Sequence, residues 1–568
     1  MTAEPETPGS GNNASFPRGK ELSTLLCALA LCGGVTTSLR AQDVTHGSHP
    51  LGVVEFPVSC SSRAQEEFNR AVALLHHMTY PQARHAFEQV AATDPQCAMA
   101  HWGIAMTLFQ PLWPTRPGPA DLQRGWNEVQ QAQALKPPTG RERLFIAATG
   151  AFFLDPASSD YWLRIRRWEQ ASEKVYGAFP DDLDAAAFYA VAHLATTPAN
   201  AVSREHADRA ATILLEVYER QPEHPGAMHY LVHANDMPGR ERESLEITHK
   251  YESVAPRNPH ALHMPTHIYT RLGDWDAVIR GNLRAAEAAL EHPAGDKSQY
   301  VWDEFPHAIE YLVYAYLQQG ADDDAHAQLQ RLRNTRNLEP TFKTAFHLAS
   351  TQARYALERR DWEQAAAIAP REPAALAWDR FTWPEAIQQF ARGLGSLHRK
   401  DIDAASAALA RLEALEASTR KSGEDLFARN IGVLRLALSA WIADAQGKGV
   451  DAVTLMRQAA ELEHSTPKHA VTPGPTLPAY EQLGDLLLAH AQPAQALAAY
   501  RRSLEQHPNR FNSIAGAARA ADAMGDAGLA RDYYSQLLQT AKNGTRQSVL
   551  DEARRKLDAA PGQERDAR

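Results

Sequence analysis

An interval of 34 residues constrains the fold of this chain more than any other feature of its sequence. Near the C-terminus, Ala530 follows Ala496 by 34 residues, and Tyr534 follows Tyr500 by the same interval. Small residues at fixed points let two helices approach closely, and an aromatic residue fills the gap to the next unit. Strand-like runs of alternating valine, isoleucine and threonine are almost absent. The interval therefore predicts stacked helix pairs over most of residues 60–555.

The motif residues of the C-terminal unit are Leu483, Gly484, Ala496, Tyr500 and Pro508. They resemble the tetratricopeptide repeat (TPR), a helix–turn–helix unit of about 34 residues. Residues 80–95 and the turn at 272–275 show parts of the same pattern. The resemblance implies an all-α fold, an α-solenoid of TPR-like helix-turn-helix repeats. It also implies that the first helix of each unit lines a concave groove.

The chain is long enough for about three to five ordinary domains or for one repeat array, and the periodicity favours the array. We predict four segments along its 568 residues. They are a leader over 1–41, an N-terminal TPR-like solenoid with a histidine-rich groove site over 42–350, divergent helical repeats over 351–470, and a C-terminal TPR pair over 471–560.

The leader has the features of a secretory signal peptide. Arg18 and Lys20 precede an apolar stretch over 25–35, and small residues follow before Gln42. The apolar stretch is too short to span a bilayer as a helix. We therefore predict a periplasmic or secreted protein with no transmembrane helix after the signal is removed. Cys60 and Cys97 remain in the mature chain, and their spacing leaves open whether they pair.

Composition and motifs exclude several common function classes. The formal net charge of −10 argues against nucleic acid as the main partner. The four cysteines form no C-x-x-C motif, which argues against a cysteine-based zinc ribbon. The sequence also lacks the phosphate-binding loop, the esterase elbow, the zincin motif and the dinucleotide fingerprint.

Two histidine pairs carry the strongest functional signal. His229 and His233 are four residues apart, as are His263 and His267, so each pair shares one helix face. The second pair follows the first by 34 residues, member for member. The TPR resemblance implies that these histidines occupy groove positions 5 and 9 of adjacent units, with Asp236 at position 12. We predict that the four histidines are metal ligands.

Extending the same register brings further residues to this part of the groove. They are Tyr189, His193, His260, His307 and Glu310. In the TPR register, His260 and His307 both occupy position 2 of their units. We interpret this set as extra ligands or as partners that orient the ligands.

The ligand chemistry indicates a transition metal. Imidazole suits copper, zinc and iron, and catalytic zinc sites typically combine three protein ligands with water. Met228, Met237 and Met264 lie beside the histidines and favour copper slightly. We therefore expect copper or zinc, with iron as a third candidate, and Asp236 as a ligand or a general base.

Two functions from different classes remain open. The first is an exported metal-dependent enzyme, hydrolytic or oxidative, that binds a small molecule or peptide in its groove. The second is a non-catalytic periplasmic TPR scaffold or peptide-binding module with a protein partner, whose histidines recognise an anionic group or simply line the groove. Residues 259–275 also resemble a segment of large exported bacterial TPR proteins of unassigned role, which implies no activity.

Two further features lie near this region. Several prolines surround Trp113. We predict a plain connection between units for this stretch, with a lid at the groove rim as the alternative. Arg271 falls at position 13 of its unit, facing the groove. It would either neutralise an anionic substrate or form a structural ion pair.

Overall fold

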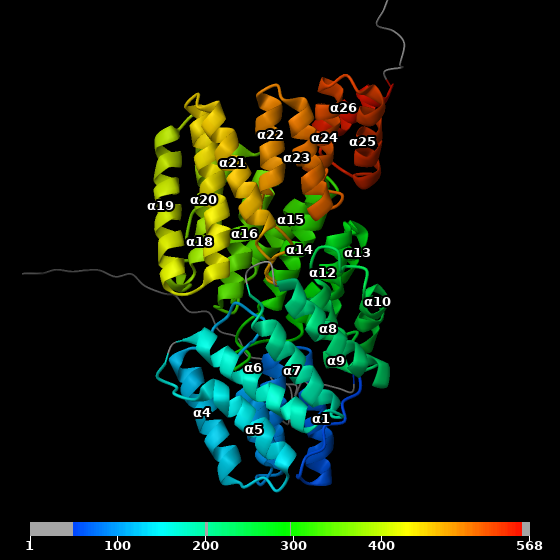
Figure 1. Ribbon diagram of the computed structural model, residues 1–568, viewed down its shortest axis with the longest axis vertical. Coiled ribbons are helices and arrows are strands. Elements are labelled where there is room, and N and C mark those ends of the chain that lie inside the picture. The colour runs from blue at the N-terminus through cyan, green and yellow to red at the C-terminus, as the bar shows by residue number, and fades with distance from the viewer. Residues whose placement is uncertain (1–48, 159, 199–202, 296, 559–568) are drawn as a thin grey trace, which may run out of the picture. The chain divides into compact units, whose positions relative to one another are not determined.

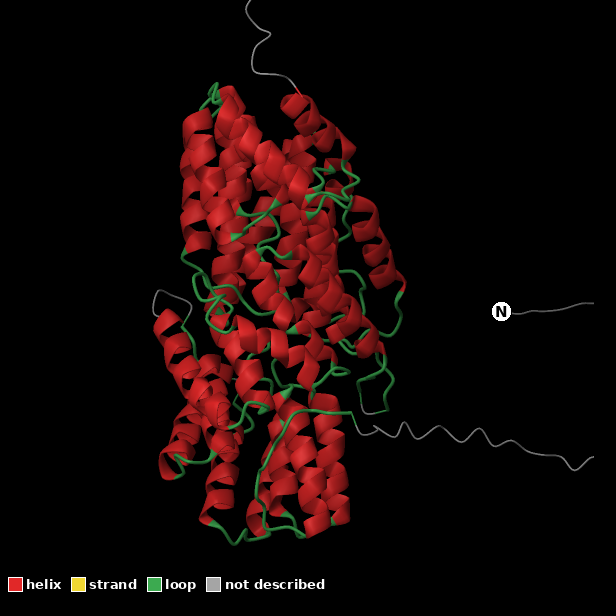
Figure 2. Cartoon of the chain, turned by 90° about the vertical axis from the view of Figure 1, so that its right-hand side faces the viewer, coloured by secondary structure: helices red, strands yellow, loops and turns green. Residues whose placement is uncertain are grey.

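The computed structural model describes residues 49–158, 160–198, 203–295 and 297–558, and the predicted leader over 1–41 lies outside them. Contacts divide the chain after Ser48, and every described residue belongs to the second unit. Within the described residues there are helices and connections but no strand, only two isolated bridges (Figure 2). The predicted all-α class is confirmed.

Consecutive helices pack against each other in pairs, as TPR-like units require (Figure 1). The pairs before the histidine region are α1 (Ser62–His76) with α2 (Tyr80–Thr93), α3 (Ala98–Met106) with α4 (Pro119–Ala134), α5 (Gly140–Phe153) with α6 (Tyr161–Ala178), and α7 (Leu183–Ala195) with α8 (Ser203–Arg220). The histidine region contains α9 (Pro225–Asn235), α10 (Leu245–Val254), α11 (Pro259–His263), α12 (Pro265–Leu272), α13 (Trp275–Leu290), α14 (Glu304–Gln318) and α15 (Asp322–Asn334).

The remaining described helices continue the stack toward the C-terminus. They are α16 (Phe342–Glu358), α17 (Trp362–Ala366), the 3-10 turn η1 (Trp378–Arg380), α18 (Thr382–His398), α19 (Ile402–Lys421), α20 (Asp425–Ala445), α21 (Gly449–His464), α22 (Ala479–Ala489), α23 (Pro493–Gln506), α24 (Phe511–Ala523), α25 (Ala527–Thr540) and α26 (Gln547–Asp558). The predicted boundaries at residues 350 and 470 stay predictions.

The 34-residue interval sets where the histidine-bearing helices begin. The helices α9 and α11 start at Pro225 and Pro259, where a missing N–H costs nothing. The residue before each proline caps its helix, since His224 Nδ1 and Asn258 Oδ1 each accept a backbone hydrogen bond. Pro265 then divides α11 from α12, because it cannot donate the next helical hydrogen bond.

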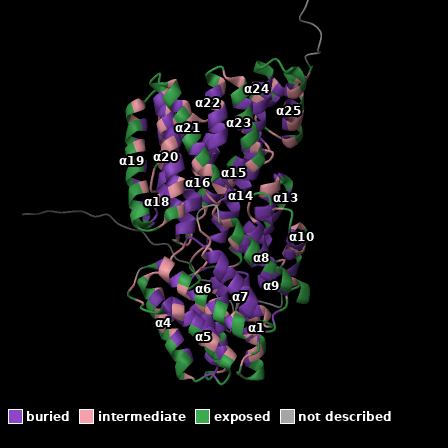
Figure 3. Cartoon of the chain, in the orientation of Figure 1, coloured by how far each residue is buried: buried purple, intermediate pink, exposed green. Residues whose placement is uncertain are grey.

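Two hydrophobic core clusters meet at the histidine region. One buried cluster runs from Val54 to Ile268, and a second runs from Leu262 to Ala520. Both clusters therefore include residues of the short segment formed by α11 and α12. Figure 3 shows buried residues following one side of most helices, the pattern expected of stacked amphipathic helices.

C-terminal repeats contact the helices of the histidine region. Trp275 Nε1 donates to the carbonyl oxygen of Asn509 at 3.0 Å, and α14 packs against α24. At the tight turn after α12, Gly273 has a φ of +66°, and an added Cβ would lie 2.6 Å from the carbonyl oxygen of Pro508. These contacts join the histidine region to the C-terminal repeats.

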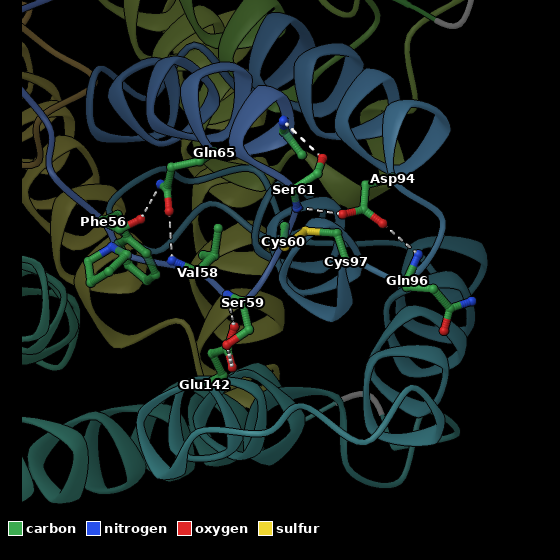
Figure 4. The surroundings of a disulfide bond; sticks show 12 residues. Phe56, Val58, Ser59, Cys60, Ser61, Gln65, Asp94, Gln96, Cys97 and Glu142 are labelled. Atoms are coloured by element: carbon green, nitrogen blue, oxygen red, sulfur yellow. Dashed lines mark hydrogen bonds between the residues drawn. A yellow bond between two sulfur atoms is a disulfide. The ribbon is translucent and has the colours of Figure 1, made fainter.

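Cys60 and Cys97 form a disulfide in this structure, which answers the question that their spacing left open (Figure 4). The bond joins the segment before α1 to the start of α3. Two hydrogen bonds flank it: Asp94 Oδ2 accepts from the Ser61 N–H at 2.7 Å, and Glu142 accepts from Ser59. The N-terminal repeats are thus tied together near this bond.

Among the described residues, α20 has the length and apolar composition of a membrane-spanning helix, with a mean hydropathy of 1.3. About half of that stretch (56%) is buried within the protein. It packs between α19 and α21. Its apolar character is accounted for by these contacts in the repeat core.

Candidate metal centre

Six histidines converge at the crossing of α9, α11, α12 and α14, in two groups of three. The first triad consists of His229 and His233 from α9 and His260 from α11. His229 Nε2 lies 3.1 Å from His233 Nε2 and 3.0 Å from His260 Nε2. Three imidazole nitrogens from two helices therefore point at one small volume.

The second triad repeats this arrangement one unit further along the chain. It consists of His263 from α11, His267 from α12 and His307 from α14. His263 Nε2 lies 3.0 Å from His267 Nε2, and the His263 and His307 ring centroids are 4.1 Å apart. The His233 and His267 rings of the two triads are 6.1 Å apart, so the triads are neighbours.

One rule describes both triads. Each takes two histidines four residues apart from one repeat unit and a third from position 2 of the next unit. The sequence predicted the two pairs and placed His260 and His307 among the additional residues. In the structure these two histidines complete the triads. The two predicted pairs thus belong to two separate groups and do not form one four-histidine site.

Hydrogen bonds define the tautomers of the first triad. His229 Nδ1 lies 2.6 Å from the carbonyl oxygen of His76, which can only accept, so Nδ1 carries the hydrogen. His260 Nδ1 lies 3.1 Å from Glu304 Oε2. Burial would raise the pKa of Glu304, but the Lys343 ammonium and the neighbouring histidines together lower it, and the carboxyl is ionised. His229 therefore presents an unprotonated Nε2, and Glu304 orients the His260 ring so that its Nε2 faces the same point.

The second triad is oriented in the same way by other partners. His263 Nδ1 lies 2.7 Å from Asn282 Oδ1, and the Asn282 amide is fixed because its Nδ2 donates to Val278. His267 Nδ1 lies 2.8 Å from Asp236 Oδ2. Both Nδ1 atoms must donate, and Nε2 of each ring is left with its lone pair.

The facing nitrogens give the triads their chemical character. Burial lowers the pKa of His229 and His263 well below the usual value and that of His267 to about 4, so these rings are neutral. The Nε2 lone pairs of His263 and His267, 3.0 Å apart, repel each other unless they share a cation. Two nitrogens that bind one ion at about 2 Å in tetrahedral geometry lie roughly 3.3 Å apart. The spacing fits that requirement.

Asp236 touches both the second triad and two cations. Its Oδ2 accepts from His267 and lies 2.6 Å from Lys468 Nζ, while Oδ1 accepts from Arg271 Nε at 2.9 Å. Burial would raise the pKa of Asp236, but the Lys468 and Arg271 charges hold it well below its usual range. Since both oxygens are engaged, the geometry suits Asp236 to orienting His267. Arg271 forms the ion pair that was one of its two predicted roles.

A cavity of about 20 Å³ lies between the triads. That is enough for one water-sized guest. Its lining includes His233 and His260 of the first triad and His267 and His307 of the second. Trp113 closes one side, 5.2 Å from the His260 ring. The stretch around Trp113, predicted to be a connection or a lid at the groove rim, joins α3 to α4 and also lines this cavity.

Three of the additional predicted residues lie apart from the triads. Tyr189 donates to Glu173, and His193 forms a separate, partly exposed group with Glu169 and His206. Glu310 accepts from His347 at 2.6 Å, and Ser350 and Arg354 also donate to it. Its carboxylate is fully engaged within the neighbouring helix interface.

Sequence reasoning missed several residues of the centre. Asn282, Glu304 and Lys343 lie outside the 34-residue register, and their types alone indicate nothing. His76 forms a buried group with Asp184 and His224. There, His76 Nε2 lies 2.8 Å from Asp184 Oδ1, so a donor faces an acceptor. This group differs from the second triad, in which acceptor faces acceptor.

Comparisons with known proteins leave this chain without a family. No family model matches it, and no curated protein matches it. Among solved structures it is similar to the crystal structure of the APC/C hetero-tetramer Cut9-Hcn1 over 88% of this chain and 97% of that chain, with 13% identity and a TM-score of 0.30. A likeness at that level carries no inference about the site. The TPR-like architecture rests on the paired helices and their repeat interval.

Proposed function

We propose that this chain is a transition-metal protein that holds one ion on each histidine triad. The observation that carries the proposal is the pair of Nε2–Nε2 contacts, 3.0 Å apart in each triad, between rings whose Nδ1 atoms must donate elsewhere. A shared cation is the arrangement that satisfies both lone pairs. The orienting carbonyl, amide and carboxylate partners are those that metal-bound histidines use.

We further propose that the centre is catalytic. Three histidine ligands leave a coordination position for water or substrate, as in catalytic zinc sites. The cavity between the triads has room for such a guest, and two neighbouring ions can stabilise an attacking and a leaving oxygen together. Imidazole ligands suit copper and zinc, which are our first candidates, and they also suit iron. Hydrolysis and oxidation are both compatible with this ligand set.

An oxidising compartment is part of the proposal. The apolar leader resembles a secretory signal, and the disulfide between Cys60 and Cys97 supports export because such bonds persist outside the reducing cytosol. The alternative is a non-catalytic scaffold or peptide-binding module.

Elemental analysis of the purified chain tests the proposal. After growth with copper, zinc and iron supplied, we expect about two equivalents of one metal, and a value below about 0.2 would contradict the proposal. The variants His229→Ala/His233→Ala and His263→Ala/His267→Ala should each lose one of the two equivalents. The exposed His490→Ala serves as the matched control and should keep both.

A further inference from the structure

A second and larger cavity lies beside the metal centre. It has a volume of about 480 Å³, within the range of small-molecule sites. Helices α16, α18 and α20 supply one wall, and residues 465–478, which we call the strap, supply another. The apolar lining consists of Phe346, Trp383, Ile387, Val433 and Leu434. The cavity can therefore hold a sizeable apolar or aromatic group.

One end of this cavity carries more positive than negative charge. Asp236, Arg271 and Lys468 all line it, and the single carboxylate is shared by both cations. The side chains of Arg271 and Lys468 are only 8% and 10% exposed. Water screens them poorly, and the second cation lacks a full counter-charge.

The other titratable groups of the lining do not supply that counter-charge. Burial raises the pKa of Glu463 to about 8, so this carboxyl is protonated at neutral pH. Burial lowers the pKa of His469 to about 3 and that of His507 well below its usual value, so both rings are neutral. The remaining ionisable residue, His464, is exposed at the rim.

The strap places this charged end next to the metal centre. Ala470 and Val471 line the small cavity between the triads, whereas Lys468 and Thr472 line the larger one. The strap is held by hydrogen bonds from Arg354 to the carbonyl oxygens of Gly474 and Pro475 at 2.9 and 2.8 Å. A group bound at Lys468 would be separated from His267 by Asp236 alone.

We propose that the larger cavity binds a small molecule with an apolar body and one carboxylate. The apolar body packs against Trp383 and Phe346, and the carboxylate pairs with Lys468 and Arg271. As a substrate site this assignment rests on the proposed function, but the binding itself rests only on the cavity and its charge.

The test uses 4-phenylbutyrate and its neutral match 4-phenylbutanamide as probes. Calorimetry is done on the full chain with metal removed by chelation, at neutral pH. We expect saturable binding of the acid with an affinity about tenfold above that of the amide, because a poorly screened ion pair is lost in the amide. In Lys468→Met, the affinity for the acid should fall to that for the amide. In Lys468→Arg, the acid should still bind about tenfold more tightly than the amide.

A second pair of variants tests the location. Val433→Trp fills the cavity and should abolish binding of both probes, and Val450→Trp, at a side chain that is 84% exposed, should change nothing. Ile387→Trp gives the same test if Val433→Trp does not fold. Equal affinities for acid and amide, or unchanged binding in the filled cavity, would overturn the proposal. Probe binding by a chain that holds no metal as purified, by elemental analysis, would contradict the proposed function alone. Metal in the purified chain with no probe binding after chelation would contradict the cavity assignment alone.

Discussion

Three successive helix interfaces in this protein share one geometry but differ in chemistry. In the first two, the position-5 histidines His229 and His263 meet His260 and His307 of the next unit. In the third, between α14 and α16, Glu310 meets His347 at 2.6 Å. At the histidine interfaces imidazole nitrogens face one another, with the Nε2 lone pairs of His263 and His267 3.0 Å apart. The third interface brings a donor to an acceptor.

At the third interface the Glu310 carboxylate is fully paired by side chains of α16. Burial would raise the pKa of Glu310, but the His347 hydrogen bond and the Arg354 charge lower it. Every oxygen of the carboxylate has a donor. The comparison shows that burial of polar groups does not by itself mark a binding site. Mismatched hydrogen-bonding capacity does, because it needs a cation that the chain does not supply.

Removing the buried cation of the matched interface should have the largest effect. Arg354→Met leaves Glu310 buried without its charge partner, and we expect the free energy of unfolding to fall by about 3–5 kcal/mol. Urea denaturation followed by circular dichroism measures this, with and without chelator. The double variant Arg354→Met/Glu310→Gln should recover part of the loss. A loss that appears only after chelation would remove the distinction between the interfaces.

The contribution of the histidine interfaces to the free energy of unfolding should depend on bound metal, whereas that of the third interface should not. At a free metal concentration of about 100 times the dissociation constant, binding to the folded state adds about 2.7 kcal/mol to its free energy of unfolding. Thermal and urea unfolding of the chelated and reloaded protein measure this gain. His229→Ala/His263→Ala, with one histidine removed from each triad, should lose it, whereas His490→Ala should retain it. An equal gain in both variants would place the metal elsewhere.

Orienting residues should have the next smaller effect. Asn282→Ala removes the acceptor that fixes the His263 tautomer, and we expect the metal affinity of the second triad to fall about 10–100-fold. Competition with a chromophoric chelator measures this affinity. Asn282→Asp keeps an acceptor and should preserve binding, and the first triad should be unaffected in both variants. Equal loss in alanine and aspartate variants would point to packing rather than orientation.

The smallest expected effect concerns a buried carboxyl without a cation. Glu463 accepts from the Ala479 N–H, and burial raises its pKa to about 8 from an ordinary value near 4.5. The folded state therefore holds this proton more tightly than the unfolded state does. Its contribution to stability is complete below about pH 4.5 and is lost as the pH rises toward about 8.

Glu463→Gln removes this pH dependence. Between these pH values, the wild type should lose about 1 kcal/mol more unfolding free energy than the variant, less than the full linkage value because the larger cavity admits water. Urea unfolding across the pH range measures the difference. Parallel pH profiles would show that Glu463 is ionised in the folded state.

The sequence by itself determined the repeat and the faces of its helices. The 34-residue interval starts α9 and α11 on equivalent prolines, and spacing of four residues puts each histidine pair on one helix side. It also placed His260 and His307 at equivalent positions of their units. These are local consequences of helix geometry, and they do not depend on how distant repeats pack.

Only the tertiary structure decided how the six histidines group. Each triad takes its third histidine from the next unit, and that depends on how neighbouring helices cross. The tertiary structure also decided what encloses them. Lys468 reaches Asp236 from the strap, and Trp113 packs against His260 from a loop near the N-terminus. Such contacts join segments more than a hundred residues apart. They depend on small rotations summed over many repeats, which periodicity in the sequence does not specify.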